Sequence, residues 1–224
     1  YIRVPALNVD RGTFLLPESV SFEEGTFIEP LACVLRGQRT VNIGPGQSVL
    51  ILGSGISGLL HLLLAQSMGA GRIIMTDINE FRLKTAKELG ADAAINAKDD
   101  VIGALRKVNE GRLADLVIVC AGSSAVFSQA LQAIERAGTI LCFAPAAPGE
   151  TLNVPVNDFW RNQIKIIHSY GSGPADNAMA LELLKAKRIK VGRLITHRLK
   201  LAQIGEGFRI MAESKDSIKV IIEA

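Results

Sequence analysis

Short apolar runs alternate along the chain with longer segments rich in helix-forming residues. Residues 48–52, Ser-Val-Leu-Ile-Leu, are apolar and lie between glycine-containing turns, which predicts a buried strand. A helix is predicted next, over residues 59–68, because these residues are helix formers and Gly69 provides a C-terminal stop. The same alternation then repeats along the chain.

The repetition of this unit predicts the fold class. Further strands are predicted at residues 72–76, 93–95, 116–119, 139–143 and 164–167, and further helices at residues 80–89, 101–109 and 125–136. Strands separated by helices pair in parallel through right-handed crossovers. The sequence therefore predicts an α/β fold, a doubly wound parallel sheet covered by helices on both faces.

One segment between the last two strands has two interpretations. Residues 152–156 alternate apolar and polar positions as far as Pro155, which cannot donate to an inner ladder. The segment is either an edge strand that could pair with its copy in a second subunit, or a covered surface loop.

The two ends of the chain fit the alternation less well. In the second of them, residues 169–224, we predict a helix over 178–186 and short strands at 194–197 and 217–222. We expect this segment and residues 1–35 to belong to another domain.

Composition narrows the class of protein. Hydrophobic residues make up 48% of the chain and the mean hydropathy is +0.27, which suits a sheet buried on both faces. No apolar stretch of about 18 residues predicts a membrane span, and no secretory signal is visible. The net charge of +3 includes no basic block, which argues against nucleic acid. The chain begins at Tyr1 rather than Met, which we interpret as a truncation, although processing would give the same start.

Residues 53–58, Gly-Ser-Gly-Ile-Ser-Gly, form a GxGxxG motif between a predicted strand and a predicted helix. That context is the one a dinucleotide-binding turn requires. Gly53 would permit the tight turn, Gly55 would let a pyrophosphate approach the backbone, and Gly58 would let the helix pack on the sheet. With Ile56 and Ser57, these glycines present the helix N-terminus to phosphates.

An acidic residue ends the next strand, about 20 residues after the motif, as dinucleotide-binding folds require. Asp77 can accept hydrogen bonds from the adenosine ribose and would repel a 2′-phosphate, so NAD is favoured over NADP. Ile78 and Arg82 are assigned to the same site, although Arg82 could equally be a solvated helix residue. Two alternatives are a glycine turn without a ligand and a methyltransferase. The latter typically carries GxGxG after an acidic residue, a pattern that this chain lacks.

Several segments together resemble one family. They are Glu29-Pro30-Leu31-Ala32, Gly44-Pro45-Gly46, residues 49–55, Asp77, residues 89–92, Val119-Cys120-Ala121-Gly122 and residues 217–222. In this order they resemble the zinc-containing alcohol dehydrogenases, the medium-chain dehydrogenase/reductase group. The resemblance covers essentially the whole chain.

The resemblance implies two domains. A Rossmann domain that binds NAD would span residues 36–168, and residues 1–35 would be a remnant of a GroES-like catalytic domain. The helix and strands of residues 169–224 would return to that catalytic domain. Most of the family's catalytic half has no counterpart, so we interpret the chain as a fragment that is inactive alone.

The resemblance also implies site residues. Glu29 matches a glutamate at or near the catalytic zinc in the polyol-dehydrogenase branch, and the other zinc ligands have no counterpart. The residues expected to line the nicotinamide pocket are Cys120, Ala121, Gly122, Phe143 and Ala144. Lys219 matches a basic residue that meets the pyrophosphate, although a lone lysine there could also be solvent-exposed.

The remaining histidines and cysteines show no ligand spacing. His61, within a leucine-rich helix, is predicted to be a core or boundary residue rather than a ligand. Cys33 and Cys142 are predicted to be core residues. The absence of CxxC spacing indicates a reduced, cytoplasmic protein.

We therefore expect the NAD-binding portion of a zinc-dependent alcohol or polyol dehydrogenase that transfers a hydride from a secondary alcohol. A homo-oligomer, dimer or tetramer, is expected, without membrane or nucleic-acid partners. One alternative is a non-catalytic NAD-binding module. Another is a zinc-free NAD(P)H reductase of the same superfamily, against which Asp77 argues.

Overall fold

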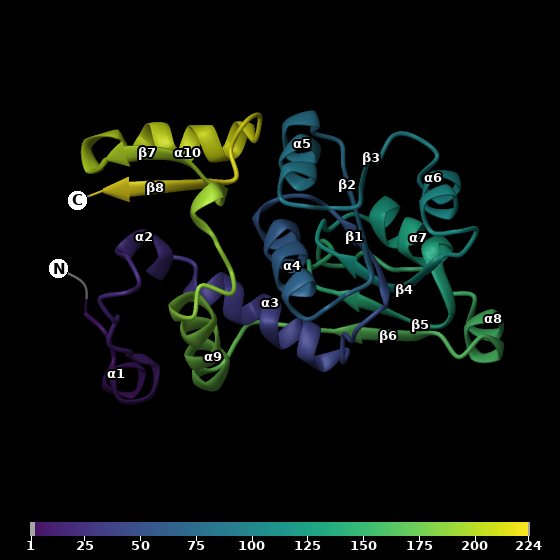
Figure 1. The fold of residues 1–224 in the computed structure, drawn as a ribbon, viewed down its shortest axis with the longest axis horizontal. Helices are drawn as coiled ribbons and strands as arrows, with labels where there is room; N and C mark the ends of the chain where they lie inside the picture. Colours follow the sequence, from purple (N-terminus) through teal and green to yellow (C-terminus); the bar gives the residue numbers. More distant parts are fainter. Residues whose placement is uncertain (1–2, 224) are drawn as a thin grey trace.

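The computed structural model describes residues 3–223. Its main feature is a parallel sheet with the strand order β3-β2-β1-β4-β5-β6 (Figure 1). The strands are β1 (Ser48–Leu52), β2 (Arg72–Asp77), β3 (Ala93–Asn96), β4 (Ala114–Val119), β5 (Ile134–Cys142) and β6 (Lys165–His168). The winding direction reverses between β1 and β4, so the predicted doubly wound sheet is confirmed.

Helices cover both faces of this sheet because alternate strand residues point to opposite sides. Val49 and Ile51 pack on one face, and Leu50 and Leu52 pack on the other. The first face carries α3 (Ile28–Thr40), α4 (Ile56–Ser67), α5 (Glu80–Glu88) and α9 (Pro174–Lys185). The second carries α6 (Val101–Val108), α7 (Ser124–Ala133) and α8 (Val156–Arg161).

Helix α3 runs through the predicted domain boundary between residues 35 and 36. Its Leu31 and Leu35 are buried in the same core as Leu184 of α9. Each of the two flanking segments therefore contributes to the helical layer on the sheet, and the exact division into domains stays a prediction.

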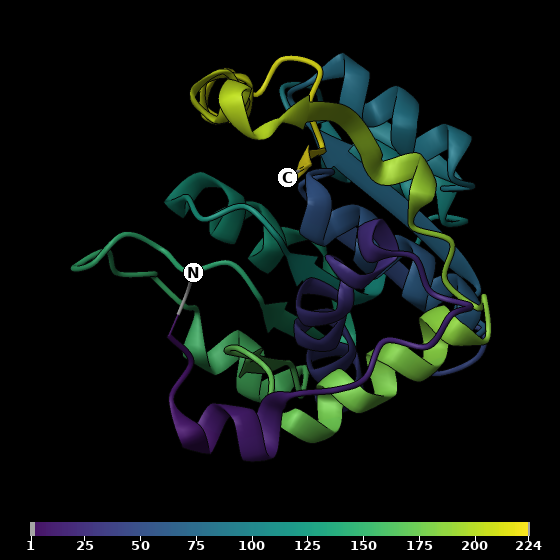
Figure 2. The same cartoon turned by 90° about the vertical axis from the view of Figure 1, so that its left-hand side faces the viewer.

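A second, smaller unit lies beside the main sheet (Figures 1 and 2). Strands β7 (Ile195–Lys200) and β8 (Lys219–Glu223) pair in parallel, and α10 (Ile204–Glu213) packs on them. The short helices are α1 (Ala6–Gly12), α2 (Phe22–Gly25), η1 (Gly192–Leu194) and η2 (Leu201–Gln203). No helix between residues 3 and 223 has both the length and the apolar character needed to cross a bilayer.

Several element bounds differ from the predictions; α9, for example, begins at Pro174 rather than Ala178. Helix α7 ends at Ala133 rather than Arg136, because Ile134 is extended and pairs with Ala114 of β4. Residues 152–156 do not form the alternative edge strand. They form a loop up to Pro155, which precedes the first turn of α8, and β6 is the edge strand on that side of the sheet.

Candidate dinucleotide site

Two glycines of the 53–58 turn are required by the fold itself. Gly53 has φ +107°, which disfavours any side chain, and a Cβ there would lie 3.2 Å from the carbonyl carbon of Cys120. A Cβ on Gly58 would lie 1.9 Å from the carbonyl oxygen of Gly53. The turn can therefore pass from β1 into α4 only with glycine at both positions.

Gly55 is different, because the fold leaves open space beside it. Its φ of −72° is allowed for any residue, and a Cβ there would have only Arg82 Nη1 nearby, at 3.8 Å. Gly55 is also the N-cap of α4 and provides no capping side chain. The first-turn amides, including those of Ile56 and Ser57, are therefore available to an external anion.

Asp77, at the end of β2, lies directly beside this turn. Its buried carboxylate accepts a hydrogen bond from Ser54 N at 2.8 Å and another from Asn79 N at 3.0 Å. Arg82 Nη1 lies 4.0 Å from Asp77 Oδ2, and its buried Nε has no partner in the described chain. The structure thus brings together the glycine turn, Asp77 and Arg82, with the exposed Ile78 next to them.

The segments that follow β4 and β5 also meet at the carboxyl edge of the sheet. The amides of Phe143 and Ala144 donate to Val119 O at 3.1 and 2.9 Å. A Cβ on Gly122 would lie 1.9 Å from Pro145 O, so these two segments are in contact. Cys120 precedes this contact, and burial raises the pKa of its thiol, which stays protonated at neutral pH.

The predicted metal residue, Glu29, is exposed near the start of α3. Cys33, one turn later, donates its thiol to Glu29 Oε1 at 3.2 Å. Cys33 is only half-buried, so its assignment to the core was wrong, because its thiol bonds to the exposed Glu29 carboxylate. Cys142 is buried as predicted. The i, i+4 spacing of Glu29 and Cys33 could have revealed this pair.

Lys219 begins β8 and is held against the residues before α3. Its Nζ donates to Thr26 O at 3.0 Å and lies 4.8 Å from the centre of the Phe27 ring. Burial lowers the pKa of Lys219, and the negative charge of Glu29 opposes this shift. The lysine therefore links the β7–β8 unit to the Glu29 region, and its contact with a pyrophosphate stays a prediction.

His61 is a core residue, as predicted, with no exposed surface. Burial lowers the pKa of its imidazole to about 3. The sequence did not reveal that its ring meets Phe143 edge to face, with ring centroids 4.6 Å apart. Only the folding of the sheet brings these two distant residues together.

Burial of His61 is expected to make the fold less stable as the pH falls below about 6.5. The unfolded chain binds a proton there with an ordinary pKa of 6.5, whereas the folded pKa is about 3. Between these values the unfolded state holds the extra proton, so the free energy of unfolding decreases by up to about 1.4 kcal/mol per pH unit. Urea titrations should record a loss of about 2 kcal/mol between about pH 7.5 and pH 5.

The His61→Leu variant is the control for this loss. Four carboxylates have lowered pKa values in the folded chain, and their ordinary values of 4.5 or below keep them mostly ionised down to pH 5, so their contribution to the loss is small; they are Glu23, Glu24, Asp115 and Glu135. We expect the pH dependence to flatten in His61→Leu. An unchanged slope would assign the loss to another group.

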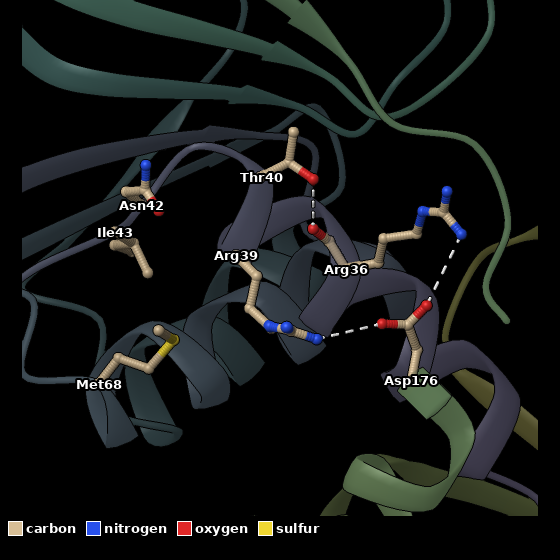
Figure 3. Close-up of a pocket in the computed structure, with 7 residues that line it drawn as sticks. All are labelled: Arg36, Arg39, Thr40, Asn42, Ile43, Met68 and Asp176. Atoms are coloured by element: carbon tan, nitrogen blue, oxygen red, sulfur yellow. Dashed lines mark hydrogen bonds and ion pairs between the residues drawn. The ribbon is translucent and has the colours of Figure 1, made fainter. Parts of the chain in front are cut away.

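Two pockets lie near these elements. One, of about 350 Å³, opens beside Ala144 on the α7 face and is lined mainly by apolar side chains such as Phe127, Leu152 and Ile166. The other, of about 520 Å³, is shown in Figure 3. Arg36 and Arg39 both point toward Asp176 there, and none of the predicted site residues lines it.

The doubly wound sheet and its glycine turn define a dinucleotide-binding α/β protein. Sequence comparison then gives the family. The sequence model of the zinc-binding dehydrogenases matches residues 57–186, more than half of the chain. The chain belongs to this zinc-binding dehydrogenase family.

Three similar proteins agree with this assignment. An L-idonate 5-dehydrogenase of Vitis vinifera is 34% identical over 93% of this chain and 58% of its own length. A sorbitol dehydrogenase of Gallus gallus is 31% identical over 94% of this chain and 59% of its own length. A crystal structure from Sinorhizobium meliloti 1021, of a protein assigned as a zinc-binding dehydrogenase and bound to NADP, is 27% identical with a TM-score of 0.86, over 94% of this chain and 62% of that one. The chain thus spans less than two thirds of the length of these relatives.

Proposed function

We propose that this chain is the NAD-binding portion of an enzyme that transfers a hydride from a secondary alcohol or polyol to NAD. The observation that carries the proposal is the open space at Gly55. Packing does not require glycine there, whereas a pyrophosphate that approaches the backbone does. The uncapped start of α4 offers amide donors to the same group.

The adenosine end of the cofactor is assigned to Asp77, Ile78 and Arg82. Each oxygen of Asp77 already accepts one backbone amide, and a carboxylate has lone pairs left for ribose hydroxyls. The negative charge of Asp77 would repel a 2′-phosphate. We therefore propose NAD as the cofactor, although one solved relative is bound to NADP.

The nicotinamide end is assigned to the carboxyl edge of β4 and β5, at Cys120, Ala121, Gly122, Phe143 and Ala144. Ligands of doubly wound sheets bind at this edge, next to the point where the strand order reverses. Lys219 is assigned to the pyrophosphate. Its present hydrogen-bond partner is the backbone oxygen of Thr26, which Lys219 would have to leave to reach the pyrophosphate.

Zinc is assigned to the intact enzyme rather than to this chain alone. Between residues 3 and 223, no group of three or more histidine, cysteine, aspartate or glutamate side chains could hold a metal ion, and a catalytic zinc takes three protein ligands. Glu29 would supply one ligand at most. When bound, zinc acts as a Lewis acid on the alcohol oxygen.

The proposed domains are residues 1–35 and 169–224 as parts of a catalytic domain, and residues 36–168 as the cofactor domain. Most exposed large apolar side chains of the described residues lie in the two flanks, for example Leu7, Leu15 and Phe208. Exposed apolar side chains in such numbers indicate a surface that is normally covered. We also propose a cytoplasmic homo-oligomer, dimer or tetramer, which acts on a small alcohol or polyol.

Calorimetric titration with NAD and with NADP tests the cofactor proposal. We expect NAD to bind more tightly, and Asp77→Ala to weaken NAD binding by about tenfold or more, because it removes a charged hydrogen-bond acceptor. Binding of NADP should change less, because the same substitution also removes a repulsion.

Asp115→Ala is the matched control for Asp77→Ala. Asp115 also accepts a hydrogen bond from a backbone amide, that of Ser48. It lies near the amino-terminal ends of the strands, whereas Asp77 lies at their carboxyl ends. This variant should lose stability without losing affinity for NAD. Equal binding of NAD and NADP to the wild-type chain would contradict the assignment of Asp77.

A second candidate function is a non-catalytic NAD-binding module. The observation in its favour is that the described residues hold no metal cluster. An assay of NAD reduction with polyols and added zinc distinguishes the two for this chain. We expect NAD binding without turnover from the chain alone, and turnover only when a catalytic domain with the remaining zinc ligands is joined to it.

A further inference from the structure

A buried polar pair lies between α3 and α4. His61 and Gln38 have no exposed surface. Gln38 Nε2 donates to His61 Nδ1 at 3.1 Å and to His61 O at 2.8 Å. Both amide hydrogens are thereby used, so Nδ1 is an acceptor and the imidazole proton lies on Nε2. The pair fixes one tautomer and one orientation of the ring.

Stability alone does not explain this pair. His61 Nε2 and Gln38 Oε1 have no hydrogen-bond partner within the described chain. Unpaired buried polar atoms destabilise a fold, and an apolar pair of similar size would avoid this cost. The pair therefore suggests a role other than packing.

The fixed imidazole holds the ring of Phe143. The two rings meet at an angle of 89°, with centroids 4.6 Å apart. Both also lie against Gly37 of α3, where a Cβ would be 3.4 Å from Phe143 Cδ2 and 3.6 Å from His61 Cε1. The Phe143 ring therefore rests against His61 on α4 and against the side-chain-free position of Gly37 on α3.

Phe143 connects this pair to the proposed nicotinamide end. It follows the last residue of β5, and its amide and that of Ala144 share Val119 O as acceptor. Gly37 lies on the same side of α3 as Cys33 and Glu29, which precede it by one and two turns. The Phe143 ring therefore lies between the end of β5 and the side of α3 that carries Glu29.

We propose that His61 is a positioning residue for the nicotinamide end of the bound dinucleotide, and that it acts through Phe143. The inference rests on the proposed binding of NAD. The adenosine end, at Asp77, belongs to β2, on the other side of β1 from β4 and β5. Loss of His61 should therefore affect the nicotinamide half selectively, whereas a purely structural role would affect both halves equally.

The test compares NAD with ADP-ribose, which lacks the nicotinamide, in calorimetric titrations of the 224-residue chain. We expect His61→Leu to weaken NAD binding by about five- to tenfold, the size of a lost aromatic pairing, and ADP-ribose binding by less than about twofold. Leu105→Ala is the control, because Leu105 is fully buried in the core on the opposite face of the sheet. It should show no such selectivity.

Gln38→Leu provides an independent variant should His61→Leu fail to fold. It keeps the imidazole but removes the amide that orients it, so the same selective loss is expected. Equal losses for both ligands, or no loss, would overturn the role of His61. Equal affinities of the wild-type chain for NAD and ADP-ribose would also overturn it. A wild-type chain that binds neither ligand would instead overturn the proposed function itself.

Discussion

A Gly55→Ala chain is expected to keep its fold and to lose about 100-fold in affinity for NAD, or about 2.7 kcal/mol. The backbone at Gly55, φ −72° and ψ −171°, suits alanine, and the new methyl group would touch nothing closer than Arg82 Nη1 at 3.8 Å. This methyl group would occupy the space through which the pyrophosphate approaches the amides of α4. Alanine restricts the unfolded chain but is a poorer N-cap than glycine, so these two effects oppose each other and stability should change by less than about 1 kcal/mol.

Calorimetry with NAD and a urea titration measure the two effects separately. Gly192→Ala is the matched control, because Gly192 also lacks a positive φ and a Cβ there would have no atom within 4 Å. It should change stability by a similar amount without changing NAD affinity. If Gly55→Ala binds NAD as tightly as the wild-type chain, the glycine turn does not hold the pyrophosphate.

Gly58→Ala is expected to lower the free energy of unfolding by about 3 kcal/mol or more, and to lose NAD binding as a consequence. A Cβ at Gly58 would lie 1.9 Å from the carbonyl oxygen of Gly53 and 2.9 Å from its carbonyl carbon. Both are backbone atoms that cannot rotate away. Helix α4 would therefore have to move off the turn and off the sheet core that it covers.

The denaturant midpoint measures this loss. Gly55 and Gly58 lie three residues apart and receive the same methyl group, so each variant serves as the control for the other. Gly55→Ala should impair only binding, and Gly58→Ala should impair folding first. A wild-type midpoint in Gly58→Ala would show that α4 can shift without cost, and the fold would then not require glycine at this position.

The sequence by itself determined the alternation of strands and helices, because it is encoded in contiguous segments. Residues 48–52 form β1 with the predicted bounds, since an apolar run between turns has few other stable states. The glycine turn and Asp77 were also readable, because they follow successive strands whose carboxyl ends lie at the same edge. Segment ends were less certain, as at Ile134, where pairing with Ala114 overrides helix propensity.

Only the tertiary structure decided which side chains meet across elements. Gln38 and His61 are 23 residues apart, and Phe143 follows β5, much further along the chain. Their contact depends on how α3 and α4 pack on β5. The link between Lys219 and Thr26 likewise joins residues 193 positions apart. Such contacts depend on the packing of several elements at once, and no local pattern of residues encodes that packing.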